Sequence, residues 1–408
     1  MDLHEDARSQ QDDLARLRQD LHREPEIGLD LPRTQERVLR ELDGLGLEIS
    51  TGTDTTSVTA VLRGEGSARD SAAPRTVLLR ADMDALPVQE ATGLDFAATN
   101  GAMHACGHDL HTTSLVGAAR LLHTHRDRLN GDVVLMFQPG EEGWDGAGVM
   151  LKEGVLDAAG RRVDAAYGLH VFSSMLPSGQ FASRPGTLMS ASHKLLVTVH
   201  GEGGHGSMPH RAKDPISAAA AMITALQTMI TRRLDIFDPA VLTVGVIRGG
   251  TKRNVIPATA EFEATVRCFS DDTAALLDTT IRETIDGVAR ANGVTADVVF
   301  ENEYPVTVTD VDETAFGAEV VRETIGEQYY TELPNPVAGS EDFSRVLAAV
   351  PGTFLGLGAL MPGLEPHTAP NNHSPYADFD PSVLSRAATV YAELAVRRLD
   401  RFAEGALR

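Results

Sequence analysis

Four short fragments of the chain carry side chains that together can bind metal ions and activate water. They supply a thiol, imidazoles and two adjacent carboxylates, which belong to Cys106, His108, His170, His373, Glu141 and Glu142. Thiolate, neutral imidazole and carboxylate are the three kinds of protein ligand that Zn²⁺ accepts. If one glutamate of the adjacent pair binds metal, its neighbour is free to act as a general base toward water. The combination therefore indicates a metal-dependent hydrolase.

Other interpretations explain fewer of these residues. A lone Cys-x-His pair can be a buried thiol beside a surface histidine, since buried free cysteines are common. A cysteine nucleophile paired with a histidine would leave the two glutamates, His170 and His373 without a role. Adjacent glutamates are usually solvated surface charge. Here, however, the pair follows an apolar run and a Pro-Gly dipeptide, which is typical of a loop at the end of a strand.

The candidate ligands are expected where buried strands end. Apolar runs predict strands at 58–62, 76–79, 133–137 and 165–169. Asp82 and Asp84 follow the second strand, the glutamate pair follows the third, and His170 stands at the tip of the fourth. A helix is expected at 112–123, between the second and third strands. Alternating strands and helices imply a largely parallel, doubly wound α/β sheet, which usually presents its site at the carboxyl ends of the strands.

Residues 186–301 show a different order of elements. Strands are expected at 193–200, 241–247, 259–269 and 294–300, with helices at 214–233 and 271–291. This β-α-β-β-α-β order is the split arrangement of a ferredoxin-like α+β domain. We therefore expect a discontinuous first domain at 1–185 and 302–408, with the second domain inserted at 186–301.

A glycine-rich segment at 201–206 matches the pattern G-x-G-x-x-G and follows a predicted strand. A dinucleotide-binding loop requires a helix that begins at the third glycine and an acidic residue about 20 positions later. Here the helix begins only at Asp214-Pro215, and the corresponding later position is Leu226. We therefore reject nucleotide binding and expect the loop to carry His205 close to another group.

Composition limits the class of protein and its partners. A chain of 408 residues with 42% hydrophobic residues is long enough for two or three domains with real cores. It has 58 acidic and 36 basic residues and a net charge of −22, which disfavours nucleic acid and anionic membranes as partners. The first residues do not resemble a signal peptide, so a cytoplasmic location is expected. In a reducing compartment, Cys106 and Cys268 are not expected to pair.

The motifs along nearly the whole chain resemble those of the M20 family of metallopeptidases and amidohydrolases. They are LHREPE at 21–26, RADMDALP at 80–87, MHACGHD at 103–109, QPGEEG at 138–143, GGHG at 203–206, NVIP at 254–257, GSEDF at 339–343 and NHSP at 372–375. The chain is most similar to branch D of that family. This branch includes hippurate hydrolases, N-acyl-amino-acid amidohydrolases and indoleacetyl-amino-acid hydrolases.

The resemblance implies a zinc-peptidase-like catalytic domain that binds two divalent metal ions, with Zn, Mn, Co or Ni as the candidates. By motif, Cys106 would bridge the two ions, and Glu141 would be the general base. His108 and His170 would complete one site, and Glu142 and His373 would complete the other. Asp84 would orient a ligand. The wider family has a histidine where Asp82 stands and an aspartate where Cys106 stands, so the role of Asp82 stays open.

The resemblance also assigns roles within the inserted domain, which would serve as a lid and often dimerises. His205 would reach across a homodimer, or a higher homo-oligomer, to the partner's active site. Asn254, Arg267 and Gly339 would lie beside the substrate, with Arg267 suited to a carboxylate.

The function implied is a metal-dependent amidohydrolase that cleaves the amide bond of a small-molecule N-acyl amino acid. A metallo-dipeptidase or carboxypeptidase-type exopeptidase would share the same site, so it remains an alternative. A non-catalytic metal-binding scaffold is a third possibility, which the intact general base and ligand set disfavour.

Overall fold

The computed structural model describes residues 3–67, 74–366 and 368–406. The chain divides into two compact units. Unit 1 comprises Met1–Gly186, Val308–Pro334 and Arg345–Arg408, and unit 2 comprises Thr187–Thr307 and Asn335–Ser344. The segment 335–344, which the sequence placed with the first domain, therefore groups with unit 2.

Unit 1 is built on an eight-stranded mixed sheet with the order β1-β2-β4-β3-β5-β16-β6-β15. The strands are β1 (Glu48–Thr51), β2 (Val58–Arg63), β3 (Arg75–Asp82), β4 (Gly131–Gln138), β5 (Ala165–Phe172), β6 (Phe181–Ser183), β15 (Tyr330–Glu332) and β16 (Gly352–Gly358). The central strands β4, β3, β5 and β16 run parallel, whereas β2 is antiparallel to β4 and β6 is antiparallel to β16. The predicted α/β class is confirmed. The antiparallel β1 and the three-residue strands β6 and β15 were not predicted.

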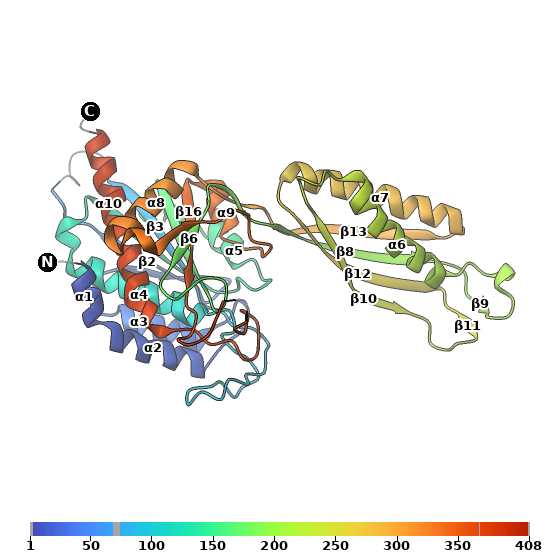
Figure 1. The fold of residues 1–408 in the computed structure, drawn as a ribbon, viewed down its shortest axis with the longest axis horizontal. Helices are drawn as coiled ribbons and strands as arrows, with labels where there is room; N and C mark the ends of the chain where they lie inside the picture. Colours follow the sequence, from blue (N-terminus) through green and yellow to red (C-terminus); the bar gives the residue numbers. More distant parts are fainter. Residues whose placement is uncertain (1–2, 68–73, 367, 407–408) are drawn as a thin grey trace. The chain divides into compact units, whose positions relative to one another are not determined.

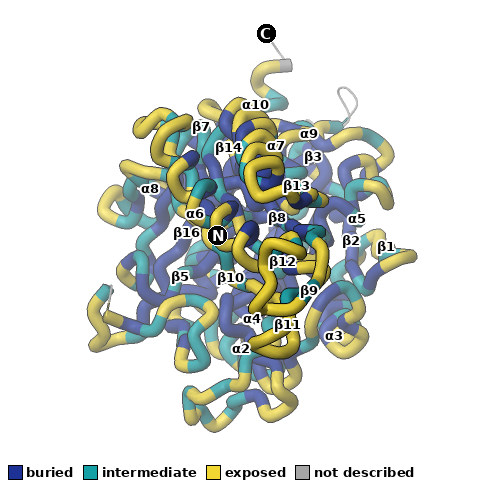
Figure 2. Tube along the Cα trace, turned by 90° about the vertical axis from the view of Figure 1, so that its right-hand side faces the viewer, coloured by how far each residue is buried: buried dark blue, intermediate teal, exposed yellow. Residues whose placement is uncertain are grey.

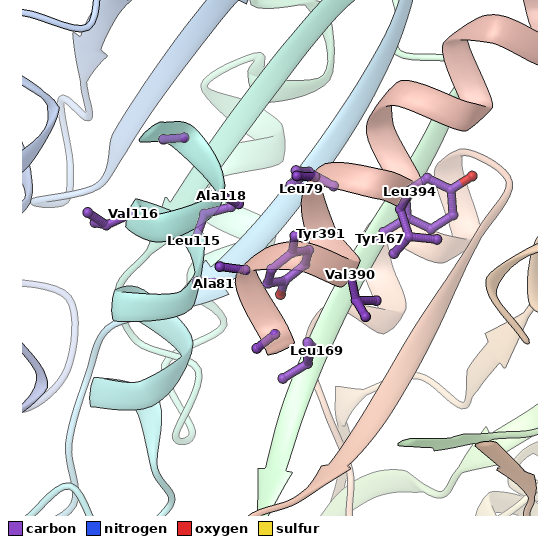
Figure 3. Close-up of a cluster of buried hydrophobic side chains, with 14 of the residues drawn as sticks. Leu79, Ala81, Leu115, Val116, Ala118, Tyr167, Leu169, Val390, Tyr391 and Leu394 are labelled. Atoms are coloured by element: carbon purple, nitrogen blue, oxygen red, sulfur yellow. The ribbon is translucent and has the colours of Figure 1, made fainter. Parts of the chain in front are cut away.

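Helices cover this sheet, and Figure 1 shows them around the central strands. They are α1 (Leu3–Ser9), α2 (Gln11–Arg23), α3 (Pro32–Leu42), α4 (His108–Thr124), α5 (Gly146–Lys152), α8 (Val311–Thr324), α9 (Ser344–Ala349) and α10 (Leu384–Ala406). The core lies between α4, α10 and the central strands. Figure 3 shows Leu115 of α4 and Leu394 of α10 together with Leu79 of β3 and Tyr167 of β5.

Helix α4 is buried over nearly its whole length. The periodic pattern predicted only 112–123, because the helix starts with polar residues that are themselves buried. Its first residue is His108, so the helix begins at the candidate metal site rather than four residues after it.

Unit 2 holds a four-stranded antiparallel sheet with the order β10-β12-β8-β13. Its strands are β8 (Ala191–His200), β10 (Val241–Gly249), β12 (Thr259–Cys268) and β13 (Thr295–Tyr304), and its two long helices are α6 (Pro215–Arg233) and α7 (Asp271–Asn292). The chain order is β8-α6-β10-β12-α7-β13, the split β-α-β-β-α-β arrangement that the sequence predicts. Both helices lie on the same side of the sheet (Figure 1).

The helices of unit 2 begin where the sequence supplies capping groups. The Asp214 side chain accepts a hydrogen bond from the backbone N–H of Ile216, and Pro215 takes the first helical position of α6. Ser270 caps α7 in the same way, by accepting from the N–H of Thr273. Alternate residues of β8, such as Val197 and Val199, are buried against these helices, which fixes the face of the sheet that forms the core.

A two-stranded ribbon of β9 (Gly204–His205) and β11 (Val255–Ile256) completes unit 2. It follows the end of β8 and precedes the start of β12, and Figure 2 shows it mainly exposed. Among the residues that the structure describes, every helix is too short or too polar to cross a lipid bilayer.

Candidate metal centre

The six candidate residues of unit 1 come together from five segments of its fold. Cys106 lies in the loop before α4, His108 opens that helix, and His170 belongs to β5. The adjacent pair Glu141 and Glu142 follows β4, and His373 lies in the loop that follows β16. Strand β5 continues to Phe172, so His170 lies two residues before the end of the strand rather than at its tip.

The thiol of Cys106 lies at the centre of the cluster. Its Sγ is 3.4 Å from Nε2 of His170 and 3.3 Å from Nε2 of His373. The Nε2 atom of His373 is also 3.1 Å from Oε1 of Glu142. Donor atoms of Cys106, His108 and His170 all lie within 4.8 Å of one another, and so do those of Cys106, Glu142 and His373. Two groups of three candidate ligands therefore share one thiol.

Buried polar atoms without partners indicate that the cluster is built for a cation. Both ring nitrogens of His108 are buried and make no hydrogen bond. Their nearest carboxylate oxygens are those of Asp84 at 3.4 Å and Asp82 at 3.6 Å. Buried polar atoms are almost always satisfied in native proteins, so atoms such as these call for an ion or a water. The thiol, imidazole and carboxylate donor set fits a divalent metal.

The electrostatics of the cluster point the same way. Burial lowers the pKa of His108, but the carboxylates of Asp82 and Asp84 outweigh it and raise that pKa well above its usual value. Hydrogen bonds with Cys106 and Glu142 raise the pKa of His373 to about 10. Both shifts report an excess of negative charge around the imidazoles, which a divalent cation would neutralise.

Two backbone conformations let the ligands face one another. Gly107 has φ +84°, and a Cβ at this position would lie 2.4 Å from Cγ2 of Val171. Only glycine therefore allows Cys106 and His108 to turn toward the same point. His373 also has a positive φ, 71°, which is rare for a residue with a side chain. Its N–H donates to the carbonyl of Ala105 at 2.8 Å, which holds this conformation in place.

Asp84 positions both glutamates. One of its carboxylate oxygens accepts a hydrogen bond from the N–H of Glu141 and the other from the N–H of Glu142, each at 3.0 Å. Asp84 is buried and lies two residues after the end of β3. Its two hydrogen bonds therefore fix the loop after β4 against the loop after β3. These hydrogen bonds are compatible with the predicted role of Asp84 in orienting a ligand, which stays a prediction.

Replacing Asp84 with asparagine should therefore impair turnover without unfolding the protein. The amide keeps the shape of the carboxylate but accepts with one oxygen only, so one glutamate N–H would face an NH₂ group. We expect kcat to fall by about 10- to 100-fold, as is typical when a group that orients metal ligands is removed. Steady-state kinetics and metal content measure this, with the exposed Asp127→Asn of the same unit as the control. An unchanged kcat would contradict the positioning role.

Asp82 and His111 form a buried pair beside the cluster, and the sequence did not show it. Nδ1 of His111 donates to Asp82 at 2.5 Å, and Nε2 of His111 accepts from the N–H of Val171 at 2.7 Å. Both ring nitrogens are therefore used, and His111 has no lone pair to offer a metal. Asp82 also accepts from Nη1 of Arg80 at 2.8 Å. Burial raises the pKa of Asp82, but Arg80 and the nearby histidines outweigh it and hold that pKa well below its usual range.

Asn372 is a second residue that sequence reasoning missed. Its Nδ2 donates to the carbonyl of Cys106 at 3.2 Å and to that of Val171 at 3.0 Å. Its Oδ1 accepts from the N–H of Ser173 at 3.0 Å. Asn372 therefore holds the His373 loop against the Cys106 loop and the end of β5. Its position directly before His373 was the available signal.

The predicted residues of unit 2 fall into two groups, of which His205 and Asn254 form the first. His205 pairs with Val255 in the β9-β11 ribbon, and the N–H of Gly206 donates to the carbonyl of Asn254 at 2.9 Å. Nδ1 of His205 accepts from the N–H of Ser207 at 3.1 Å. The hydrogen of a neutral imidazole is therefore on Nε2, where the exposed ring can donate outward.

Arg267 and Gly339 form the second group, at the other end of the sheet. Arg267 pairs in register with Ser192 at the start of β8 and donates to its hydroxyl. The carbonyl of Gly339 accepts from the N–H of Ser190 at 2.9 Å. Strand β8 is 10 residues long, and at about 3.3 Å per residue it separates this group from the His205 ribbon by roughly 30 Å.

Comparison with known proteins identifies the family. The model of peptidase family M20/M25/M40 matches residues 78–397. Thermostable carboxypeptidase 1 of Saccharolobus solfataricus is 37% identical over 399 residues, covering 97% of this chain and 98% of that protein. Hippurate hydrolase of Campylobacter jejuni is 34% identical over 393 residues, covering 95% and 97%. The crystal structure of a dinuclear metal-binding M20 peptidase from Bacillus subtilis has a TM-score of 0.81 and 30% identity, covering 96% of this chain and 99% of that one.

Proposed function

We propose that this chain, which belongs to peptidase family M20/M25/M40, is a metal-dependent amidohydrolase that releases amino acids from N-acyl amino acids. The observation that carries the proposal is the Cys106 thiol shared by two groups of candidate ligands. Glu141 directly precedes Glu142, a member of one of these groups, in the chain. One relative of this chain is named hippurate hydrolase, and this name supports an amide substrate for the chain.

The proposed centre would hold two divalent ions, and Cys106 would contribute its thiol to both sites. His108 and His170 would complete one site, and Glu142 and His373 would complete the other. The two ligand groups around one thiol support this assignment, as does the similarity to a dinuclear metal-binding peptidase. Zn²⁺, Mn²⁺, Co²⁺ and Ni²⁺ are the candidate ions, since imidazole and thiolate together suit several of them.

When bound, divalent ions lower the pKa of water toward neutrality and polarise a carbonyl group. Side chains of the protein would transfer the proton and stabilise the developing negative charge. Glu141, held by its N–H to Asp84, would take the proton from the attacking water and return it to the leaving amide nitrogen. His205 would donate a hydrogen bond from Nε2 to the oxygen that becomes negative when the amide carbon is attacked.

The proposed substrate contacts follow from the chemistry of unit 2. Arg267 carries a planar, permanently charged guanidinium that suits the carboxylate of an amino acid. It is half-buried beside Ser192, which limits its conformations before a substrate arrives. Gly339, whose backbone is fixed by Ser190, would border the same carboxylate, and Asn254 would donate to the acyl carbonyl.

The proposed assembly is a homodimer in which His205 serves the active site of the second copy. His205 and Asn254 lie at the end of unit 2 that is remote from Arg267, and the chain enters and leaves unit 2 near the Arg267 end. One small substrate would not reach both groups of one copy across roughly 30 Å of strand. A second copy that presents its own ribbon would supply the missing group.

Mixing two inactive variants tests this arrangement. His205→Ala lacks the donor and Glu141→Gln lacks the base, so a mixed dimer would contain one site with both groups intact. Random mixing makes half the dimers mixed, so we expect about a quarter of wild-type activity from variants that are each nearly inactive alone. Native mass spectrometry verifies that mixed dimers form. If verified mixed dimers regain no activity, His205 does not act in the partner's site.

A carboxypeptidase is the second candidate, because a relative with 37% identity bears that name. A peptide with a free carboxyl terminus would present the same carboxylate to Arg267 and the same amide to Glu141. The two candidates differ in what lies on the acyl side of the bond, which is an acyl group in one and an amino acid in the other.

A panel of substrates separates these functions. The chelated protein would be reconstituted with Zn²⁺, Mn²⁺, Co²⁺ or Ni²⁺ and offered N-acyl amino acids, dipeptides and longer peptides, with release of free amine as the readout. Metal-dependent turnover that is fastest on N-acyl amino acids supports the proposal. Preference for peptides would replace it with the carboxypeptidase. No turnover on any member, with metal demonstrably bound, would leave neither substrate class standing.

A further inference from the structure

A second chemically distinctive place in unit 1 is a cavity of about 300 Å³ that no residue of the metal centre lines. Its lining comes from α1, the loop before β6, the turn before β15, and the start of α10. The polar lining groups include Arg8, Ser178, Tyr329, Ser382 and Arg386. Among the described residues that line it, none carries a carboxylate. The cavity is therefore cationic in a chain whose net charge is −22.

Arg386 is held in place without an anionic partner. Its guanidinium carbon lies 4.5 Å from the centroid of the Tyr329 ring. On another side it lies against Gly179, where a Cβ would be 2.1 Å from Nη1, and Gly179 has φ +77°. In the part of the chain that the structure describes, Arg386 forms no ion pair with a carboxylate. An arginine fixed by stacking loses little conformational entropy when it binds an anion.

Arg8, on α1, adds a second positive charge to the lining. It is exposed, and it too forms no ion pair with any carboxylate in the described ranges. Unit 1 is otherwise rich in paired arginines, such as Arg18 with Asp109 at 2.7 Å. Arg8 and Arg386 therefore bring two guanidiniums, neither paired with a carboxylate of the described residues, to one cavity of an acidic protein.

The nearest carboxylate to the lining serine groups is already used. One oxygen of Asp380 accepts from the N–H of Ser382 at 2.9 Å, and the other accepts from the hydroxyl of Ser178 at 2.6 Å. The N–H of Ser385 is likewise taken, by Gln11 at 3.1 Å. These backbone amides at the helix start are therefore satisfied within the protein. The lining donors that can reach a ligand are therefore side chains, among them the two guanidiniums and the hydroxyls of Tyr329 and Ser382.

We propose that this cavity binds a phosphate-type dianion, either free inorganic phosphate or the phosphate group of a small metabolite. Guanidinium groups bind phosphate through paired, charge-assisted hydrogen bonds, and two of them match the charge of a dianion. Hydroxyl donors from two further elements suit a tetrahedral ion, whose oxygens point in several directions. The volume is at the lower end of that seen for small-molecule sites, which leaves room for more than the phosphate itself.

Calorimetric titration of inorganic phosphate into the metal-loaded full-length chain tests the site. Arg386→Gln should weaken binding by about tenfold or more, since it removes charge-assisted hydrogen bonds from a preorganised group. Arg8→Gln should weaken it less, because Arg8 is exposed. The matched control is Arg128→Gln, which removes an exposed arginine elsewhere in unit 1 and should leave affinity unchanged.

The outcomes separate this cavity from the metal centre. Phosphate bound at the metal centre would keep its affinity in both the Arg386 and Arg8 variants, and that result would overturn the proposal. Absence of binding to the wild-type chain would do the same. If Arg386→Gln fails to fold, two other variants test the site. Arg8→Gln removes one charge, and Arg386→Lys keeps the charge but loses the stacked planar fork. Both should weaken phosphate binding, and unchanged affinity in both would overturn the proposal.

A second titrant distinguishes the source of the phosphate group. A small phosphomonoester such as glycerol phosphate should bind more tightly than inorganic phosphate if the cavity serves a metabolite, since the remaining volume would then be filled. Equal or weaker binding of the ester, with Arg386→Gln still weakening the binding of both titrants, assigns the site to inorganic phosphate. The test uses binding and not turnover, so it stands whether or not the proposed hydrolysis is correct.

Discussion

Glu141→Gln should bind both metal ions and yet turn over substrate at least about a thousandfold more slowly than the wild-type chain. Glutamine keeps the length and shape of the side chain, and the Glu141 N–H would still donate to Asp84 at 3.0 Å. The amide cannot accept a proton from water or return one to the leaving nitrogen. Loss of activity without loss of metal is therefore the signature of a general base.

Two measurements make this result decisive. Metal content of the purified variants reports occupancy, and the fluorescence of Trp144, the only tryptophan of the chain, reports metal titration two residues from Glu142. The matched control is Glu142→Gln, the adjacent carboxylate, which lies in the ligand group with Cys106 and His373. We expect Glu142→Gln, unlike Glu141→Gln, to bind less metal than the wild-type chain. If Glu141→Gln keeps a wild-type kcat, the two glutamates have been assigned the wrong roles.

The candidate ligand cluster could be predicted from sequence because its combination of side chains is rare. A cysteine, histidines and paired glutamates near the ends of apolar runs have few joint explanations. In the structure β4 and β5 bring in the glutamate pair and His170, whereas the other candidate ligands come from the start of α4, the loop before it and the loop after β16. The pairing of Asp82 with His111 escaped prediction because it depends on contacts that only the fold creates, including those with Arg80 and the N–H of Val171. From the sequence alone, a buried histidine that forms a hydrogen bond with a carboxylate cannot be distinguished from one that binds a metal ion.

The organisation of unit 2 shows a different limit. The order of its elements was predictable from periodicity, since each strand and helix has its own apolar pattern. The grouping of residues 335–344 with unit 2 was not, because this segment follows elements of unit 1 in sequence and has no periodicity of its own. The separation of His205 from Arg267 also required the strand register, which pairs Arg267 with Ser192 near the start of β8, whereas His205 lies in β9, beyond the end of β8.

Cys106→Ala should lose both metal equivalents, whereas His170→Ala and His373→Ala should each retain about one. The reason is geometric, because only the Cys106 thiol belongs to both ligand groups, at 3.4 Å from His170 and 3.3 Å from His373. Metal analysis after dialysis measures the equivalents. The control is Cys268→Ala, which removes the other buried thiol of the chain, in unit 2, and should keep both.

A rescue experiment distinguishes a bridging ligand from a residue that merely packs well. The wider family carries aspartate at the position of Cys106, and a carboxylate can give one oxygen to each of two ions. Cys106→Asp should therefore recover much of the metal content and part of the activity, whereas Cys106→Ala and the isosteric Cys106→Ser should recover neither. Two equivalents retained by Cys106→Ala would remove the thiol from the ligand set, and the shared-thiol argument for two ions would fall with it.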